Sequence, residues 1–147
     1  MKNYQGKLQF EGYRIEKIVV ERLEDSKEAE ATIGFMFKIA PDNKKKIERA
    51  NVLQGVQIES NGSCKYRIEI IIKGNFRIED TLEEEKEMFL KANASAILFP
   101  YLRSLLSLIT SQLECETIIL PTMNFQLFFE DADNEEIFIS EENFEEF

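Results

Sequence analysis

Residues that commonly perform catalysis are scarce in this 147-residue chain. Histidine is absent, so the sequence contains no Ser-His-Asp triad, no Cys-His dyad and no histidine-ligated metal. The two cysteines, Cys64 and Cys115, form no CxxC motif and match neither a zinc site nor a redox motif. The glycine-rich motifs that bind phosphate groups are also absent. The sequence therefore predicts a protein that is not an enzyme and needs no cofactor.

Carboxylates are the one abundant reactive group, with 28 Asp and Glu residues. Two of them could act as general acid and base, but with so many acids the favoured interpretation is solvated surface carboxylates. Acids at positions 131, 133, 135 and 142 have the spacing of a calcium-binding loop. Glu136 stands where that loop requires glycine for its sharp turn, so we expect no metal site.

The net charge of −10 is concentrated near the C-terminal end. Residues 130–147 contain nine acids and no base, whereas residues 1–129 contain 19 acids and 18 bases. Such a chain lacks the basic surface that nucleic-acid binding requires. We therefore predict one domain over 1–129 and an acidic tail over 130–147. The tail also contains Phe138, Phe144 and Phe147, and a mixture of acidic and aromatic residues is typical of segments that contact partners.

Strands and one helix must position any functional side chain. Alternating apolar residues predict four strands, over 7–21, 31–39, 50–58 and 66–78. Asn61-Gly62 predicts a hairpin between the last two strands, because both residues tolerate positive φ. Helical apolar spacing then predicts a long helix that begins at Pro100, or near Ser95 with a kink at Pro100. The expected fold class is α+β, a four-stranded antiparallel sheet packed by a long helix in the C-terminal half.

Residues 94–113 are the only membrane-like stretch in the sequence. This stretch contains Arg103, Pro100 and four serines, which favours an amphipathic helix of a soluble protein over a membrane span. The first ten residues are polar and lack the apolar run of an export signal. We therefore expect a cytoplasmic protein with no direct membrane insertion.

Three short motifs follow one another in the second half of the chain: Gly-Asn-Phe at 74–76, Leu-Phe-Pro-Tyr-Leu-Arg at 98–103, and Asn-Phe at 124–125 after Pro121. Their order and spacing resemble the SecB family of protein-export chaperones, over about residues 64–128. The resemblance implies an α+β protomer that assembles as a homotetramer, a dimer of dimers. It also implies an ATP-independent holdase that binds non-native precursor proteins in apolar grooves and passes them to SecA.

The resemblance also implies which residues would bind partners. The family's groove runs between sheet and helix, and the candidate client-binding residues there are Phe35, Phe37, Phe99, Tyr101, Phe125 and Phe128. Core packing is the alternative role for each of these rings. Glu69 is the candidate SecA-binding residue, on the outward face of the last strand, and Arg67 stands at a nearby position that is apolar in the family.

Two further alternatives stay open. The chain could be a SecB-like interaction module, or a chaperone dedicated to one partner such as an antitoxin.

In the family the Asn-Phe element opens a second helix, but here it runs into an acidic stretch. That helix is therefore short, or it is replaced by a strand at 137–139.

Overall fold

A computed structural model of the protein describes residues 8–23, 32–42, 48–61, 64–79 and 90–131. Three features predicted from the sequence lie wholly or mostly outside these residues. They are the acidic tail from residue 132 onward, the possible strand at 137–139 and the acids with the spacing of a calcium-binding loop.

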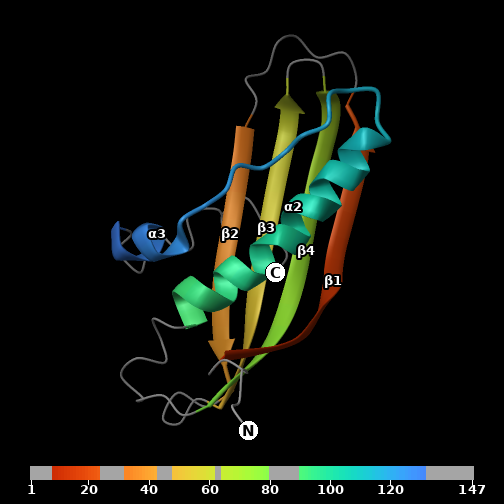
Figure 1. Ribbon diagram of the computed structural model, residues 1–147. Coiled ribbons are helices and arrows are strands. Elements are labelled where there is room, and N and C mark those ends of the chain that lie inside the picture. The colour runs from red at the N-terminus through yellow and green to blue at the C-terminus, as the bar shows by residue number, and fades with distance from the viewer. Residues whose placement is uncertain (1–7, 24–31, 43–47, 62–63, 80–89, 132–147) are drawn as a thin grey trace, which may run out of the picture.

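The four predicted strands are confirmed and form one antiparallel sheet (Figure 1). They are β1 (Leu8–Arg22), β2 (Thr32–Pro41), β3 (Arg49–Asn61) and β4 (Cys64–Ile78). Their order across the sheet is β1-β4-β3-β2, so β1 and β2 are the two edges. β3 and β4 form the predicted hairpin, with Asn61 paired to Cys64 across the connection.

The long helix is also confirmed, but it begins earlier than Pro100. A π-helical turn, η1 (Leu90–Ala94), leads directly into α2 (Ser95–Ser111), so the predicted start near Ser95 is right and the start at Pro100 is wrong. Pro100 lies inside α2 on its exposed side, while the neighbouring Leu98 and Phe99 are buried. Burial of these side chains offsets the backbone hydrogen bond that proline cannot donate. The second helix is short, α3 (Phe125–Asp131).

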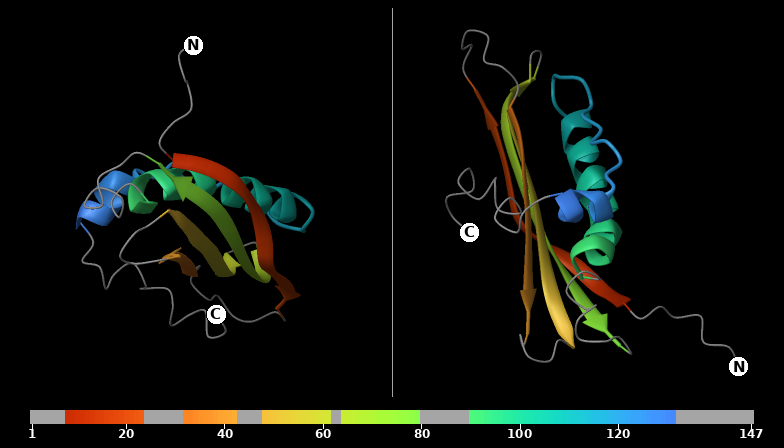
Figure 2. Two further views of the ribbon diagram at one scale, coloured as in Figure 1. Left: turned by 90° about the horizontal axis from the view of Figure 1, so that it is seen from below. Right: turned by 90° about the vertical axis from the view of Figure 1, so that its left-hand side faces the viewer.

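The helices α2 and α3 lie on one side of the sheet (Figure 2). We call the sheet face under α2 the inner face and the opposite one the outer face. Alternate residues of β3 and β4 point to the inner face and form the core with α2, among them Val56, Ile70, Ile72, Leu98 and Leu102. α2 approaches closely at Gly74, where a Cβ atom would lie 3.0 Å from Leu98 Cδ1. A glycine there permits this close contact between helix and sheet.

Two irregularities in β1 decide which of its residues face α2. The register with β4 shifts between Phe10 and Tyr13, where Gly12 has a φ of 103°, and again between Ile15 and Lys17. Each shift adds a residue and moves the following side chains to the other face. Phe10 and Tyr13 therefore share the inner face although they are three residues apart.

The segment Leu90–Ser111 has the length and apolar composition of a membrane span. Its buried residues, including Leu98, Leu102 and Leu106, belong to the core beneath it. A core helix of a soluble protein meets the same criterion of length and composition, so this feature is weak evidence for a membrane span.

Candidate functional site

Five of the six candidate client-binding rings meet at the β2 side of the molecule. Phe37 of β2 lies 5.2 Å from Phe125 and 5.4 Å from Phe128 of α3, measured between ring centroids. Phe99 of α2 lies 5.2 Å from Phe125 and 6.5 Å from Phe35. We call this group, with Phe129, the ring cluster. The strand β2 and the helices α2 and α3 lie next to one another (Figure 1), and these three elements, distant in sequence, each contribute rings to the cluster.

The ring cluster has a buried layer and a partly exposed layer. Phe37, Phe99, Phe125 and Phe129 are all buried, with exposed fractions of 1–6%. Phe35 and Phe128 keep part of their surface exposed. The core-packing alternative therefore describes the first four rings, and Phe35 and Phe128 are those that solvent or a ligand can reach.

Phe129 was not among the candidates from sequence, although it is part of the cluster through Phe128, 5.1 Å away. Its spacing of four residues from Phe125 is helical and could have identified it. Tyr101, the sixth candidate, lies elsewhere and contacts the rings of Phe10 and Tyr13 at 5.4 and 4.7 Å. It is 39% exposed. Only the first register shift of β1 explains this second aromatic group, and the sequence pattern does not show that shift.

Three polar side chains on one face of α2 bind the segment that connects α2 to α3, residues 112–124, which we call the returning segment. Arg103 Nε donates to the carbonyl oxygen of Leu120 at 2.8 Å, and Ser107 Oγ donates to that of Ile118 at 3.1 Å. Thr110 Oγ1 accepts a hydrogen bond from the Ile118 amide at 2.9 Å. The three side chains are four and three residues apart, so they lie on one face of the helix. They direct the returning segment along α2 and so position Phe125 against Phe37.

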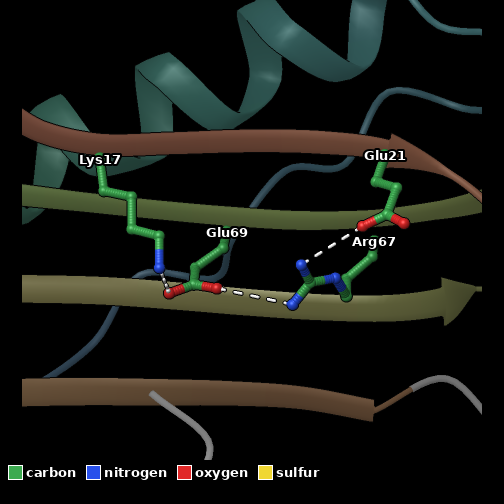
Figure 3. Close-up of polar contacts among 4 residues, drawn as sticks. All are labelled: Lys17, Glu21, Arg67 and Glu69. Atoms are coloured by element: carbon green, nitrogen blue, oxygen red, sulfur yellow. Dashed lines mark hydrogen bonds and ion pairs between the residues drawn. The ribbon is translucent and has the colours of Figure 1, made fainter. Parts of the chain in front are cut away.

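Glu69, the candidate partner-binding residue, lies on the outer face within an ion-pair network that joins β1 and β4 (Figure 3). Its carboxylate lies 3.1 Å from Lys17 Nζ and 3.9 Å from Arg67 Nη1. Arg67 also contacts Glu21 at 3.3 Å. The Glu69 side chain is only 5% exposed, and both of its carboxylate oxygens face cations of the same chain.

The part of the chain that the structure describes contains no cluster of metal-binding side chains. The described residues contain no group of three or more Cys, Asp or Glu side chains able to hold a metal ion. An open depression of about 560 Å³ lies near the start of β3, and the Arg49–Glu11 ion pair lines it. None of the candidate rings lines this depression, so it is separate from the ring cluster.

Comparison with known proteins gives one family. The family model described as preprotein translocase subunit SecB matches residues 3–136. The fold is similar to that of the Mycobacterium tuberculosis SecB-like chaperone Rv1957, solved in complex with a ChAD peptide from the Rv1956 HigA1 antitoxin. That match has a TM-score of 0.60 and 15% identity, and it covers 80% of this chain and 88% of the other.

A protein of unknown function from Streptococcus agalactiae matches with a TM-score of 0.45 and 13% identity, over 78% of this chain and 96% of that one. No curated protein matches the sequence. The family match is the decisive one, because it includes all four strands and all described helices. We conclude that this chain belongs to the SecB family.

Proposed function

We propose that the protein is an ATP-independent chaperone, a holdase that binds non-native, extended segments of other proteins at the ring cluster. Its membership of the SecB family supports a chaperone role. The observation that carries the proposed site is the layered burial of the cluster, in which Phe35 and Phe128 are partly exposed above Phe37 and Phe125. Two accessible rings above a buried aromatic layer leave an apolar surface open to a ligand.

Further apolar side chains flank the accessible rings in sequence. Ile33, 49% exposed, precedes Phe35 by two residues on the same face of β2. Leu127, 54% exposed, adjoins Phe128 in α3. Ile33 extends the apolar surface beyond Phe35, and exposed apolar surface of this kind marks a protein-binding site.

The binding energy would come from burial of apolar surface of the client, at about 25 cal/mol per Å². An unfolded client exposes such surface, whereas its folded form does not. A surface that binds only the unfolded form shifts the client away from folding by mass action, without nucleotide hydrolysis. The cluster consists of hydrocarbon rings with no charged group, so it would accept many apolar sequences.

An aggregation assay tests the proposal. The wild-type protein should slow the aggregation of several unrelated denatured clients without nucleotide. The double variant Phe35→Ser, Phe128→Ser should lose most of this protection while its circular dichroism spectrum is kept. Ile119→Ser is the matched control, because Ile119 is 69% exposed and lies in the returning segment. Equal loss of protection in the control, or none in the double variant, would contradict the proposed site.

A chaperone dedicated to one partner is the second candidate, and the state of Glu69 favours it over SecA-linked export. Glu69 is nearly buried and paired with Lys17, so it has little capacity left for a basic surface of SecA. Rv1957, which shares the fold, was solved with an antitoxin peptide. Titration with SecA and comparison of protection across clients separate the two candidates. Protection of one client only, with no SecA binding, supports the dedicated chaperone.

We also propose that the protein is cytoplasmic and assembles as a homotetramer, a dimer of dimers, as the family resemblance implies. Ile15, Ile18 and Val20 of the edge strand β1 are 41–46% exposed and provide apolar surface for contacts between copies. Multi-angle light scattering should give four times the mass of 17.2 kDa. A monomer at all concentrations would contradict this assembly.

A further inference from the structure

The outer face of the sheet has a small apolar patch that is more deeply buried than the described elements explain. Met36 of β2 and Ile71 of β4 face each other across Gly55, which has no side chain. They are 1% and 2% exposed, and Leu53 packs beside them. The helices of the described ranges lie on the inner face (Figure 2), and this cluster is separate from the main core. Such low exposure on a sheet face requires a covering segment.

Cations border this patch. Lys38 and Lys73 lie opposite Leu53 on the two neighbouring strands, and Lys17 lies opposite Ile71. Lys17 pairs with Glu69, but among the described residues neither Lys38 nor Lys73 forms an ion pair. The covering segment should therefore present an apolar centre with acidic residues on both sides.

The acidic tail has this pattern. Ile137, Phe138 and Ile139 are preceded by Asp133, Glu135 and Glu136 and followed by Glu141 and Glu142. No base occurs in residues 132–147. By contrast, residues 24–31, which also lie outside the described ranges, contain no residue more apolar than alanine. Residues 80–89 combine apolar residues with acids, but they connect Ile78 to Leu90, and both of these belong to the core on the inner face. Charge and apolar content thus both match the tail to the patch.

The position of α3 makes the connection short enough. α3 lies beside the edge strand β2 (Figure 1), and Met36 belongs to that strand. The chain from Asp131 to Ile137 spans up to about 20 Å when extended, at roughly 3.3–3.6 Å per residue. A chain leaving α3 can therefore pass around the β2 edge to the outer face.

We propose that residues 132–147 bind the outer face of their own chain, with Phe138 and its neighbouring isoleucines on Met36, Leu53 and Ile71. The flanking acids pair with Lys38 and Lys73. This surface is distinct from the ring cluster on the inner face.

Tryptophan fluorescence tests the contact in the full chain. The protein has no tryptophan, so Phe138→Trp introduces a single emitter. We expect blue-shifted emission and protection from acrylamide quenching. Lys38→Glu in this background should shift the emission to the red and at least double the quenching constant. Arg22→Glu reverses a charge at an exposed position on the inner face of β1, and it should leave the emission and the quenching constant unchanged.

A solvent-like emission of the introduced indole, or equal effects of Lys38→Glu and Arg22→Glu, would overturn the proposal. A blue shift that disappears on dilution would also overturn it, since another copy would then supply the surface. A nitroxide at Ser140→Cys, in a chain without Cys64 and Cys115, locates the tail independently. It should broaden the methyl signals of Met36 and Ile71 but not of Leu106, and the reverse pattern would refute binding to the outer face.

Discussion

Arg103 of α2 donates from Nε to the main-chain carbonyl oxygen of Leu120, 2.8 Å away, and this contact fixes the path of the segment that leads to α3. Leu120 itself is buried, with 1% exposed, so few other donors can reach its carbonyl group. Arg103, the last residue of the Leu-Phe-Pro-Tyr-Leu-Arg motif, thus stabilises the fold. It links α2 to the segment that places Phe125 in the ring cluster.

Arg103→Met should therefore destabilise the protein by about 1–3 kcal/mol, because it leaves a partly buried carbonyl oxygen without a donor. Denaturant unfolding measures the change, and amide exchange at Ile118 should accelerate in the same variant. Ser104→Ala, at an exposed position of the same helix, is the control and should change the stability by less than about 0.5 kcal/mol. Unchanged exchange at Ile118 would argue against a role for Arg103 in holding this segment.

Glu69→Gln should lower stability, because the 5%-exposed carboxylate faces both Lys17 and Arg67 and the amide would leave their charges less well compensated. A hydrogen bond to a charged group contributes about 1.5–3 kcal/mol, and the partial exposure of both cations places the expected loss at the lower end. Chemical denaturation of the two proteins gives the difference.

Glu16→Gln is the matched control for this change. Glu16 pairs with Arg14 at 2.7 Å, but the Arg14 side chain is 66% exposed and solvent screens the pair. The expected loss is below about 1 kcal/mol. If both variants lose the same stability, the outer-face network contributes no more than an ordinary surface pair.

Gly12→Ala should destabilise the protein through the backbone alone. Gly12 has a φ of 103°, which alanine rarely adopts, yet a Cβ atom added there would meet no other atom within 4 Å. The expected loss is about 1–3 kcal/mol. Gly12→Asn should lose less, because asparagine tolerates positive φ better. If alanine proves no worse than asparagine in thermal unfolding, the strained conformation at this bulge does not contribute.

Gly74→Ala tests the opposite situation, where space rather than φ is limiting. The added Cβ would lie 2.9 Å from the ring of Phe76 and 3.0 Å from Leu98. Overpacking of this kind costs about 1–3 kcal/mol. Adding Leu98→Val should recover part of the loss, since the shorter side chain makes room for the new methyl group. Additive losses in the double variant would show that the two positions do not contact each other.

Much of the fold could be predicted because its signals are local. Strand alternation, the hairpin signal at Asn61-Gly62 and the helical apolar spacing each depend on neighbouring residues. The four strands, the pairing of β3 with β4 and the long helix that they predict are confirmed. The start of α2 at Ser95 was only one of two predictions, because the π-helical turn that precedes it has no clear sequence signal. The register shifts of β1 were not predicted for the same reason.

Which of the candidate rings lie together could not be predicted from the sequence. Phe35, Phe37, Phe99, Phe125 and Phe128 do meet, whereas Tyr101 joins Phe10 and Tyr13 instead. Which rings stay accessible depends on how α3 covers β2, and the contact of Phe37 with Phe128 joins residues that are 91 positions apart (128 − 37). Glu69 was placed on the correct face by alternation, but its pairing with Lys17 depends on the second register shift.

By itself the sequence determined the fold class, the absence of the usual catalytic motifs and the concentration of acid near the C-terminal end, since these follow from composition and short-range periodicity. Only the tertiary structure decided which rings are buried, which charges pair and which face of the sheet lacks a described helix. These depend on strand register and on the direction of α2 across the sheet. A shift of one residue moves a side chain from one face to the other, and no local pattern encodes it.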